Sequence, residues 1–171
     1  MRNLKSMMAF GLLAAAAAVP GIHQAYAAEG KAETLQRETR VLETFLSNAT
    51  GGGFNVSDFN EHVLATPGAG MVPDSMIVDR SLRSETGSPI RVGEFDVGEG
   101  HPAGTAVTFE GLDNEGCLAL ARDYESPALK MVLLNSVVTW KPETGNRPAW
   151  ALGACGRQEA NSVSLVFARE E

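Results

Sequence analysis

The chain contains two cysteines, Cys117 and Cys155, and they restrict how its C-terminal half can fold. Cys117 opens a short apolar run of helical character, and Cys155 lies in a small-residue stretch before the apolar segment 162–168. Together with the export signal described next, the pair predicts a disulfide; the alternative is two unlinked, buried thiols. A bridge would close a loop of about 39 residues, worth roughly 4 kcal/mol in the chain-entropy model. Because the alternating face of segment 162–168 carries only three large apolar side chains, we expect this bridge to hold it in a sheet.

Residues 1–27 predict a secretory signal peptide. Arg2 and Lys5 make a positive start, residues 7–19 form an apolar run, and Ala25-Tyr26-Ala27 is a cleavage site of the A-x-A type. The alternative is retention as an N-terminal anchor, because the apolar run and the residues after it are just long enough to cross a bilayer.

The remaining residues, 28–171, are sufficient for one domain with its own core. The formal net charge of the chain is −7, and it becomes −9 when the two basic residues of the signal are removed. This acidity argues against nucleic acid as a partner, because the phosphates would repel the protein. We therefore expect an exported bacterial protein that contacts the membrane only if the N-terminal segment is retained.

Residues 29–49 predict an amphipathic helix. Leu35, Leu42 and Leu46 recur at helical spacing with charged residues between them. Gly51-Gly52-Gly53 ends the helix. A helix with a single apolar stripe must cover another element, so we expect it to lie against a sheet.

A second short helix is predicted over residues 58–64, and a loop with apolar side chains follows over residues 71–77. The sequence period then changes toward two, which indicates strands. Asp113 or Asn114 caps the helix that carries Cys117. The order of elements predicts an α+β domain with a mostly antiparallel sheet. The predicted strands are 90–97, 105–110, 129–134, 137–140 and 162–168, with turns at 84–89 and 135–136.

The histidines and carboxylates do not form a recognisable metal motif. His62 stands alone on the second predicted helix. His101 lies near Glu94, Asp96 and Glu99, a set of oxygen ligands that suits a hard cation. Its spacing matches no calcium loop, and a solvated acidic turn is the simpler interpretation.

The sequence carries no motif for catalysis. Trp140 and Trp150 flank a polar loop and would suit a sugar or peptide groove, although core aromatics explain them better. No nucleotide-binding glycine motif, G-x-S-x-G elbow, H-E-x-x-H pair or C-x-x-C pair is present. We therefore expect no enzyme, no cofactor and no metal, and the binding residues are unknown.

The order of these segments resembles a known family. A helix with a glycine break precedes Val72-Pro73-Asp74-Ser75-Met76, and Gly116-Cys117-Leu118-Ala119-Leu120 follows a strand pair. A strand then turns at Asn135, and Cys155 precedes the final apolar strand. Over roughly residues 30–168, this ordered set resembles the type IVb pilins, the major subunits of conjugative, bundle-forming and toxin-coregulated pili. The leader is atypical for that family, because Ala16 stands where pilins have a glutamate at the fifth mature position.

The resemblance implies a pilin-like fold with a surface-exposed C-terminal region bridged by Cys117 and Cys155. It implies a structural or adhesive subunit of a type IV pilus, or of an associated secretion or conjugation system. Implied partners are other pilin subunits, pilus assembly components, and a host or recipient-cell surface. The implied location is the periplasm, the cell surface or a pilus of a Gram-negative bacterium. The alternatives are an exported periplasmic binding module and, third, a small exported enzyme.

Overall fold

The computed structural model describes residues 30–51, 56, 59, 72–96, 104–140 and 153–168. The predicted signal peptide or anchor, 1–27, lies outside these residues. The second predicted helix, 58–64, is described only at Phe59, which is helical and fully buried.

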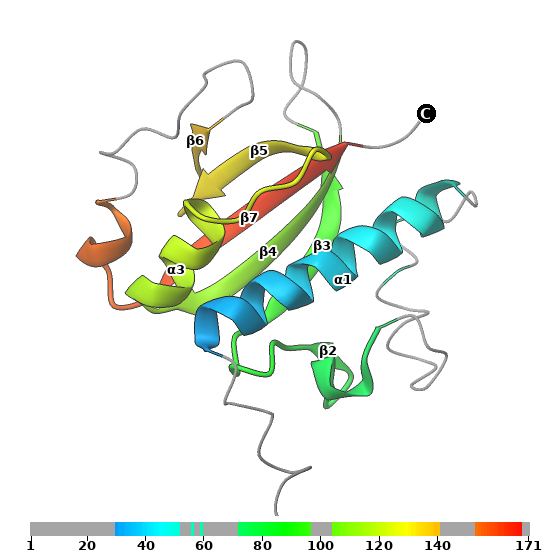
Figure 1. Ribbon diagram of the computed structural model, residues 1–171, viewed down its shortest axis with the longest axis horizontal. Coiled ribbons are helices and arrows are strands. Elements are labelled where there is room, and N and C mark those ends of the chain that lie inside the picture. Colours follow the sequence, from blue (N-terminus) through cyan, green and yellow to red (C-terminus); the bar gives the residue numbers. More distant parts are fainter. Residues whose placement is uncertain are drawn as a thin grey trace, which may run out of the picture.

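The described residues form an α+β domain with antiparallel sheets, which confirms the predicted class (Figure 1). Five strands make the main sheet in the order β3-β4-β7-β5-β6, and each neighbouring pair is antiparallel. Two very short strands make a separate hairpin. The elements are α1 (Lys31–Gly51), β1 (Ile77–Val78), β2 (Ser81–Leu82), β3 (Ile90–Phe95), β4 (Gly104–Leu112), α3 (Asn114–Ala121), β5 (Leu129–Leu134), β6 (Val137–Trp140) and β7 (Asn161–Ala168).

The C-terminal strand β7 occupies the centre of the main sheet, between β4 and β5. Its residues Val163, Leu165 and Phe167 are buried, as the alternation predicts. Val166 points to the opposite face and is also fully buried, in a second cluster with Met131 and Leu133. The strand is therefore paired along both edges and buried on both faces, and it depends less on the disulfide than its sequence alone indicates.

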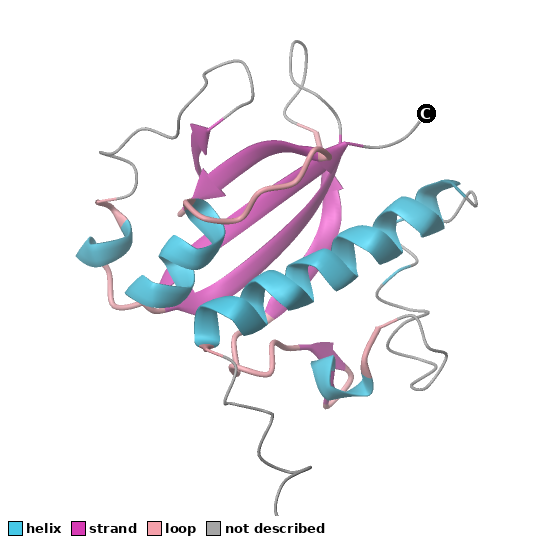
Figure 2. Ribbon diagram, viewed as in Figure 1, coloured by secondary structure: helices cyan, strands magenta, loops and turns pink. Residues whose placement is uncertain are grey.

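Two helices lie in front of one face of the main sheet (Figures 1 and 2). Leu35, Leu42 and Leu46 of α1 belong to one buried cluster with residues of α3 and of the strands. Gln36 donates a hydrogen bond to the Ala119 carbonyl of α3 at 3.1 Å. The two helices approach closely at Gly116, where an added Cβ would lie 3.0 Å from a methyl carbon of Leu35.

The caps and turns follow the local sequence chemistry. Asp113 is the N-cap of α3, and its Oδ1 accepts a hydrogen bond from the Gly116 amide at 2.9 Å. Asn135 and Ser136 both have positive φ, which is the geometry of a type I′ hairpin turn between β5 and β6. The loop predicted over 71–77 contains more structure than expected: a 3₁₀ turn at Asp74–Met76 leads into β1.

Candidate functional site

The predicted disulfide between Cys117 and Cys155 is confirmed. Cys117 lies in the first turns of α3, and Cys155 begins a 3₁₀ turn at Cys155–Arg157, with the two Cα atoms 5.8 Å apart. Both residues are fully buried. The bridge therefore ties α3 to the segment that enters β7, and no free thiol exists to act as a nucleophile.

A buried asparagine extends this covalent link with hydrogen bonds. The Nδ2 of Asn161, at the start of β7, donates to the carbonyls of Cys155 at 2.9 Å and Leu112 at 3.3 Å. Its Oδ1 accepts from the Asn135 side chain at 3.1 Å, and Asn135 in turn accepts from the Ser162 amide at 2.8 Å. One side chain thus joins the disulfide turn, the end of β4 and the β5–β6 hairpin.

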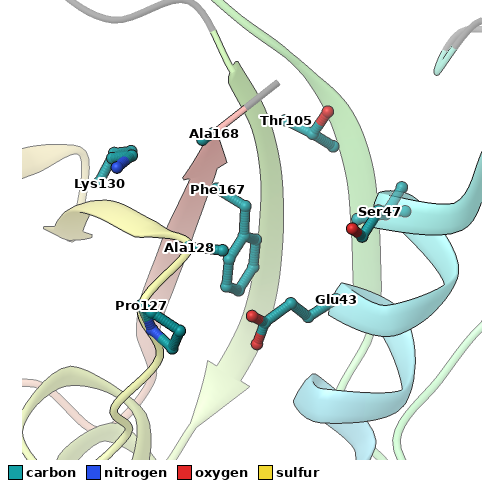
Figure 3. A pocket seen from close by; sticks show the side chains of 9 residues that line it. Glu43, Ser47, Thr105, Pro127, Ala128, Lys130, Phe167 and Ala168 are labelled. Carbon is teal, nitrogen blue, oxygen red and sulfur yellow. The ribbon is translucent and has the colours of Figure 1, made fainter. Parts of the chain in front are cut away.

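A pocket of about 340 Å³ lies at the other end of β7, beside the C-terminal half of α1 (Figure 3). It is formed by α1, the start of β4, the segment that enters β5, and the end of β7. In Figure 3 the Glu43 carboxylate points from α1 toward Pro127 and the ring of Phe167. The lining residues are Glu43, Leu46, Ser47, Thr105, Pro127, Ala128, Lys130, Phe167 and Ala168.

Glu43 is held in place by two hydroxyl groups. Tyr124 donates a hydrogen bond to one carboxylate oxygen at 2.5 Å, and Ser126 donates to the other. Tyr124 is almost fully buried and meets the ring of Phe167 edge-on, with the centroids 6.3 Å apart. Burial, and then the hydrogen bond to Glu43, raise the pKa of Tyr124, so its hydroxyl remains a donor at physiological pH.

A second carboxylate of α1, Glu38, has no exposed surface. Its Oε1 accepts a hydrogen bond from the Glu85 amide at 2.7 Å, while its Oε2 has no partner among the described residues. Burial raises the pKa of Glu38, partly offset by the neighbouring Ser84 and by the Glu85 amide. The contact joins α1 to the turn that precedes β3, where Glu85 also pairs with Arg37 at 2.9 Å.

The structure does not assemble the other sequence candidates into a site. His62, His101, Glu99 and Trp150 lie outside the described residues. In the described part of the chain, no group of three or more His, Cys, Asp or Glu residues is placed to hold a metal ion. Trp140 is partly buried and packs against the main core, as its interpretation as a core aromatic predicts.

Sequence reasoning did not single out Glu38, Glu43 or Asn161. Glu38 had a usable signal, because it lies three residues after Leu35 and four before Leu42, inside the apolar stripe. Glu43 had no such signal, because no residue near it in the sequence indicates that Tyr124 will donate a hydrogen bond to it. Burial of an asparagine at a strand start likewise depends on contacts that are distant in sequence.

Comparison with known proteins gives no relative for this chain. No protein-family model, curated protein or solved structure matches it. Of the helices in the described ranges, none is both long enough and apolar enough to cross a membrane. The resemblance to type IVb pilins therefore rests on the ordered segments of the sequence.

Proposed function

We propose that the protein is a structural or adhesive pilin-like subunit of a type IV pilus, or of an associated secretion or conjugation system, exported by a Gram-negative bacterium. The observation that carries this proposal is the buried Cys117–Cys155 bridge between α3 and the segment entering β7. In the family resemblance, the same two cysteines bound the region that contacts other subunits. We further propose that the amphipathic α1 lies across the antiparallel sheet, as a pilin-like arrangement requires.

The mechanical properties of the domain suit a filament subunit. β7 is hydrogen-bonded to β4 on one side and to β5 on the other, so pulling on its end loads two ladders together. The disulfide adds a covalent path from β7 to α3, and Asn161 connects that path to the β5–β6 hairpin. These links hold β7, α3 and the β5–β6 hairpin together under load, which a subunit that contacts a neighbouring subunit or a cell requires.

A second candidate function is an exported binding module without a role in a pilus. The pocket beside α1 is the observation that favours it, because a concave site with a fixed polar group is typical of ligand recognition. In this case the disulfide has a purely stabilising role.

Fractionation of the native bacterium distinguishes the two functions. Antibodies raised against the purified domain are used to probe filaments sheared from the cell surface, osmotic-shock fluid and membranes, with a known soluble periplasmic protein as the control. A pilin-like subunit is expected in the sheared fraction and along filaments in immunogold micrographs. Recovery of the chain only in the shock fluid, together with the control protein, would contradict the pilus role and support the binding module.

A matched pair of variants sharpens this test. The double substitution Cys117→Ala, Cys155→Ala removes the proposed mechanical link, whereas Glu159→Gln changes one exposed residue of the same region. We expect fewer or shorter filaments from the double variant at equal protein level, and normal filaments from Glu159→Gln. Equal filament yield from both variants would show that the disulfide does not contribute to filament assembly.

A further inference from the structure

The pocket at the end of β7 contains a carboxylate that forms no ion pair with a described residue. Glu43 is half-buried, and its two oxygens accept hydrogen bonds from the hydroxyls of Tyr124 and Ser126. These neutral donors position the carboxylate and supply no positive charge. Within the described ranges, Glu43 forms no ion pair, and the basic residues Lys31, Arg37, Arg91 and Arg122 pair with other carboxylates.

The other walls of the pocket suit an aliphatic chain. Leu46, Pro127 and the buried ring of Phe167 give the pocket an apolar side next to the carboxylate. The hydroxyl residues Ser47 and Thr105 lie across from Pro127 (Figure 3). The volume of about 340 Å³ is near the lower end of the range of small-ligand sites, roughly 300–1,000 Å³.

We propose that this pocket binds an alkylammonium or alkylguanidinium group, with the cation on Glu43 and the aliphatic stem against Leu46 and Phe167. A carboxylate has about four lone-pair positions, so Glu43 can accept further hydrogen bonds beside those from Tyr124 and Ser126. A bond from a cationic donor is charge-assisted and therefore stronger than those already present. The net charge of −7 also favours the approach of a cation. This inference does not depend on the proposed pilus function.

The same chemistry has two sources. It occurs in a free aliphatic amine, and it occurs in a lysine or arginine side chain of a second copy of this chain. Both place one cation at the end of a flexible apolar stem, so the pocket makes the same contacts with either. The test below identifies the group first and its source second.

Lys130 provides a test of whether the pocket prefers a cation or an anion. Its side chain lines the same pocket, so its positive charge opposes a bound cation and assists a bound anion. Lys130→Gln is therefore expected to tighten binding of an alkylammonium by about two- to threefold, since a solvent-screened charge acts weakly at this range. Glu43→Gln is expected to weaken it by about tenfold or more, because it removes a charge-assisted bond.

The experiment is a titration of the purified, oxidised protein with hexylammonium chloride, followed by the backbone amide resonances of Ala128, Lys130 and Ala168. Hexanol and sodium hexanoate are the neutral and anionic probes of the same stem length. We expect saturable shifts with hexylammonium and at least about tenfold weaker binding of hexanol. Glu159→Gln is the matched control, because it removes the same charge from an exposed position.

Circular dichroism and the melting temperature establish that each variant is folded. If Glu43→Gln does not fold, Tyr124→Phe replaces it: this variant keeps the charge but loosens the carboxylate, and it should weaken hexylammonium binding. The proposal is overturned if hexylammonium causes no saturable shifts, if hexanoate binds more tightly, or if the variant used and Glu159→Gln bind equally well. Sedimentation velocity then identifies the source. Self-association that is weakened by Glu43→Gln and by hexylammonium assigns the cation to a second copy, and unchanged sedimentation assigns it to a free amine.

Discussion

Removal of the disulfide tests the reasoning about the C-terminal region most directly. The perturbation is the double variant Cys117→Ala, Cys155→Ala, which opens the covalent loop without placing hydroxyl groups at two fully buried positions. The cysteines are separated by 38 positions, and the chain-entropy model assigns such a loop roughly 4 kcal/mol. At about 3 °C per kcal/mol for a domain of this size, the melting temperature should fall by about 10–15 °C.

The structure also predicts what survives this change. β7 retains both of its hydrogen-bonded neighbours and its burial on both faces, so the variant should still unfold in one cooperative transition. The segment around Arg157 loses its anchor, and trypsin cleavage at that exposed residue should become faster than in the parent.

Differential scanning calorimetry and limited trypsin digestion measure these two effects. The serine double variant is the informative comparison, because its two buried hydroxyls should add about 1–3 kcal/mol each to the loss. A parent and an alanine variant that melt within about a degree of each other would refute the assignment of loop-closure stability to this bridge.

Three further predictions concern single side chains. Asn161→Ala should lower the free energy of unfolding by about 2–4 kcal/mol, because it leaves the Cys155 carbonyl and other buried groups without their hydrogen-bond partner. Urea unfolding measures this free energy, and a loss below about 0.5 kcal/mol would contradict the hydrogen-bond network around Asn161. Burial raises the pKa of Glu38, so the contribution of the protonated carboxyl to stability is present below the ordinary pKa and is lost as pH rises through the raised value. The melting temperature of Glu38→Gln relative to the parent should therefore increase from about pH 4 to about pH 8, and a pH-independent difference would contradict the raised pKa. Gly116→Ala should lower the free energy of unfolding by about 1–3 kcal/mol, since the new methyl lies 3.0 Å from a methyl carbon of Leu35 in α1. Gly156→Ala is the control for crowding, because its new methyl lies 3.8 Å from the nearest atom, and equal losses in both variants would point to a backbone effect instead.

Much of the local structure was readable from the sequence because it depends on neighbouring residues. The bounds of β5 and β6 match the prediction, since two apolar runs separated by two turn residues specify a hairpin. The cap at Asp113 follows from its position before an apolar helical run. The disulfide followed from the count of cysteines and the expected export.

The arrangement of the strands was not readable in the same way. Alternation identified β7 as a strand, but it does not say which strands will be its neighbours. The consecutive apolar residues Leu165, Val166 and Phe167 did contain information, because such a run is typical of a strand buried on both faces. The pocket around Glu43 could not be predicted from the sequence, since its walls come from α1 and the ends of three strands that are far apart in the sequence.

The central place of β7 has a consequence for the order of events during synthesis. The β3–β4 and β5–β6 pairs can form as soon as their own residues leave the ribosome. The β4–β7 and β5–β7 ladders must wait for residues 161–168, which emerge after the other strands of the main sheet. Until then the two hairpins have no strand between them and the main core lacks Val163, Leu165 and Phe167. The main sheet therefore cannot close before β7 has been synthesised, and a truncation within β7 removes the middle of the sheet rather than an edge.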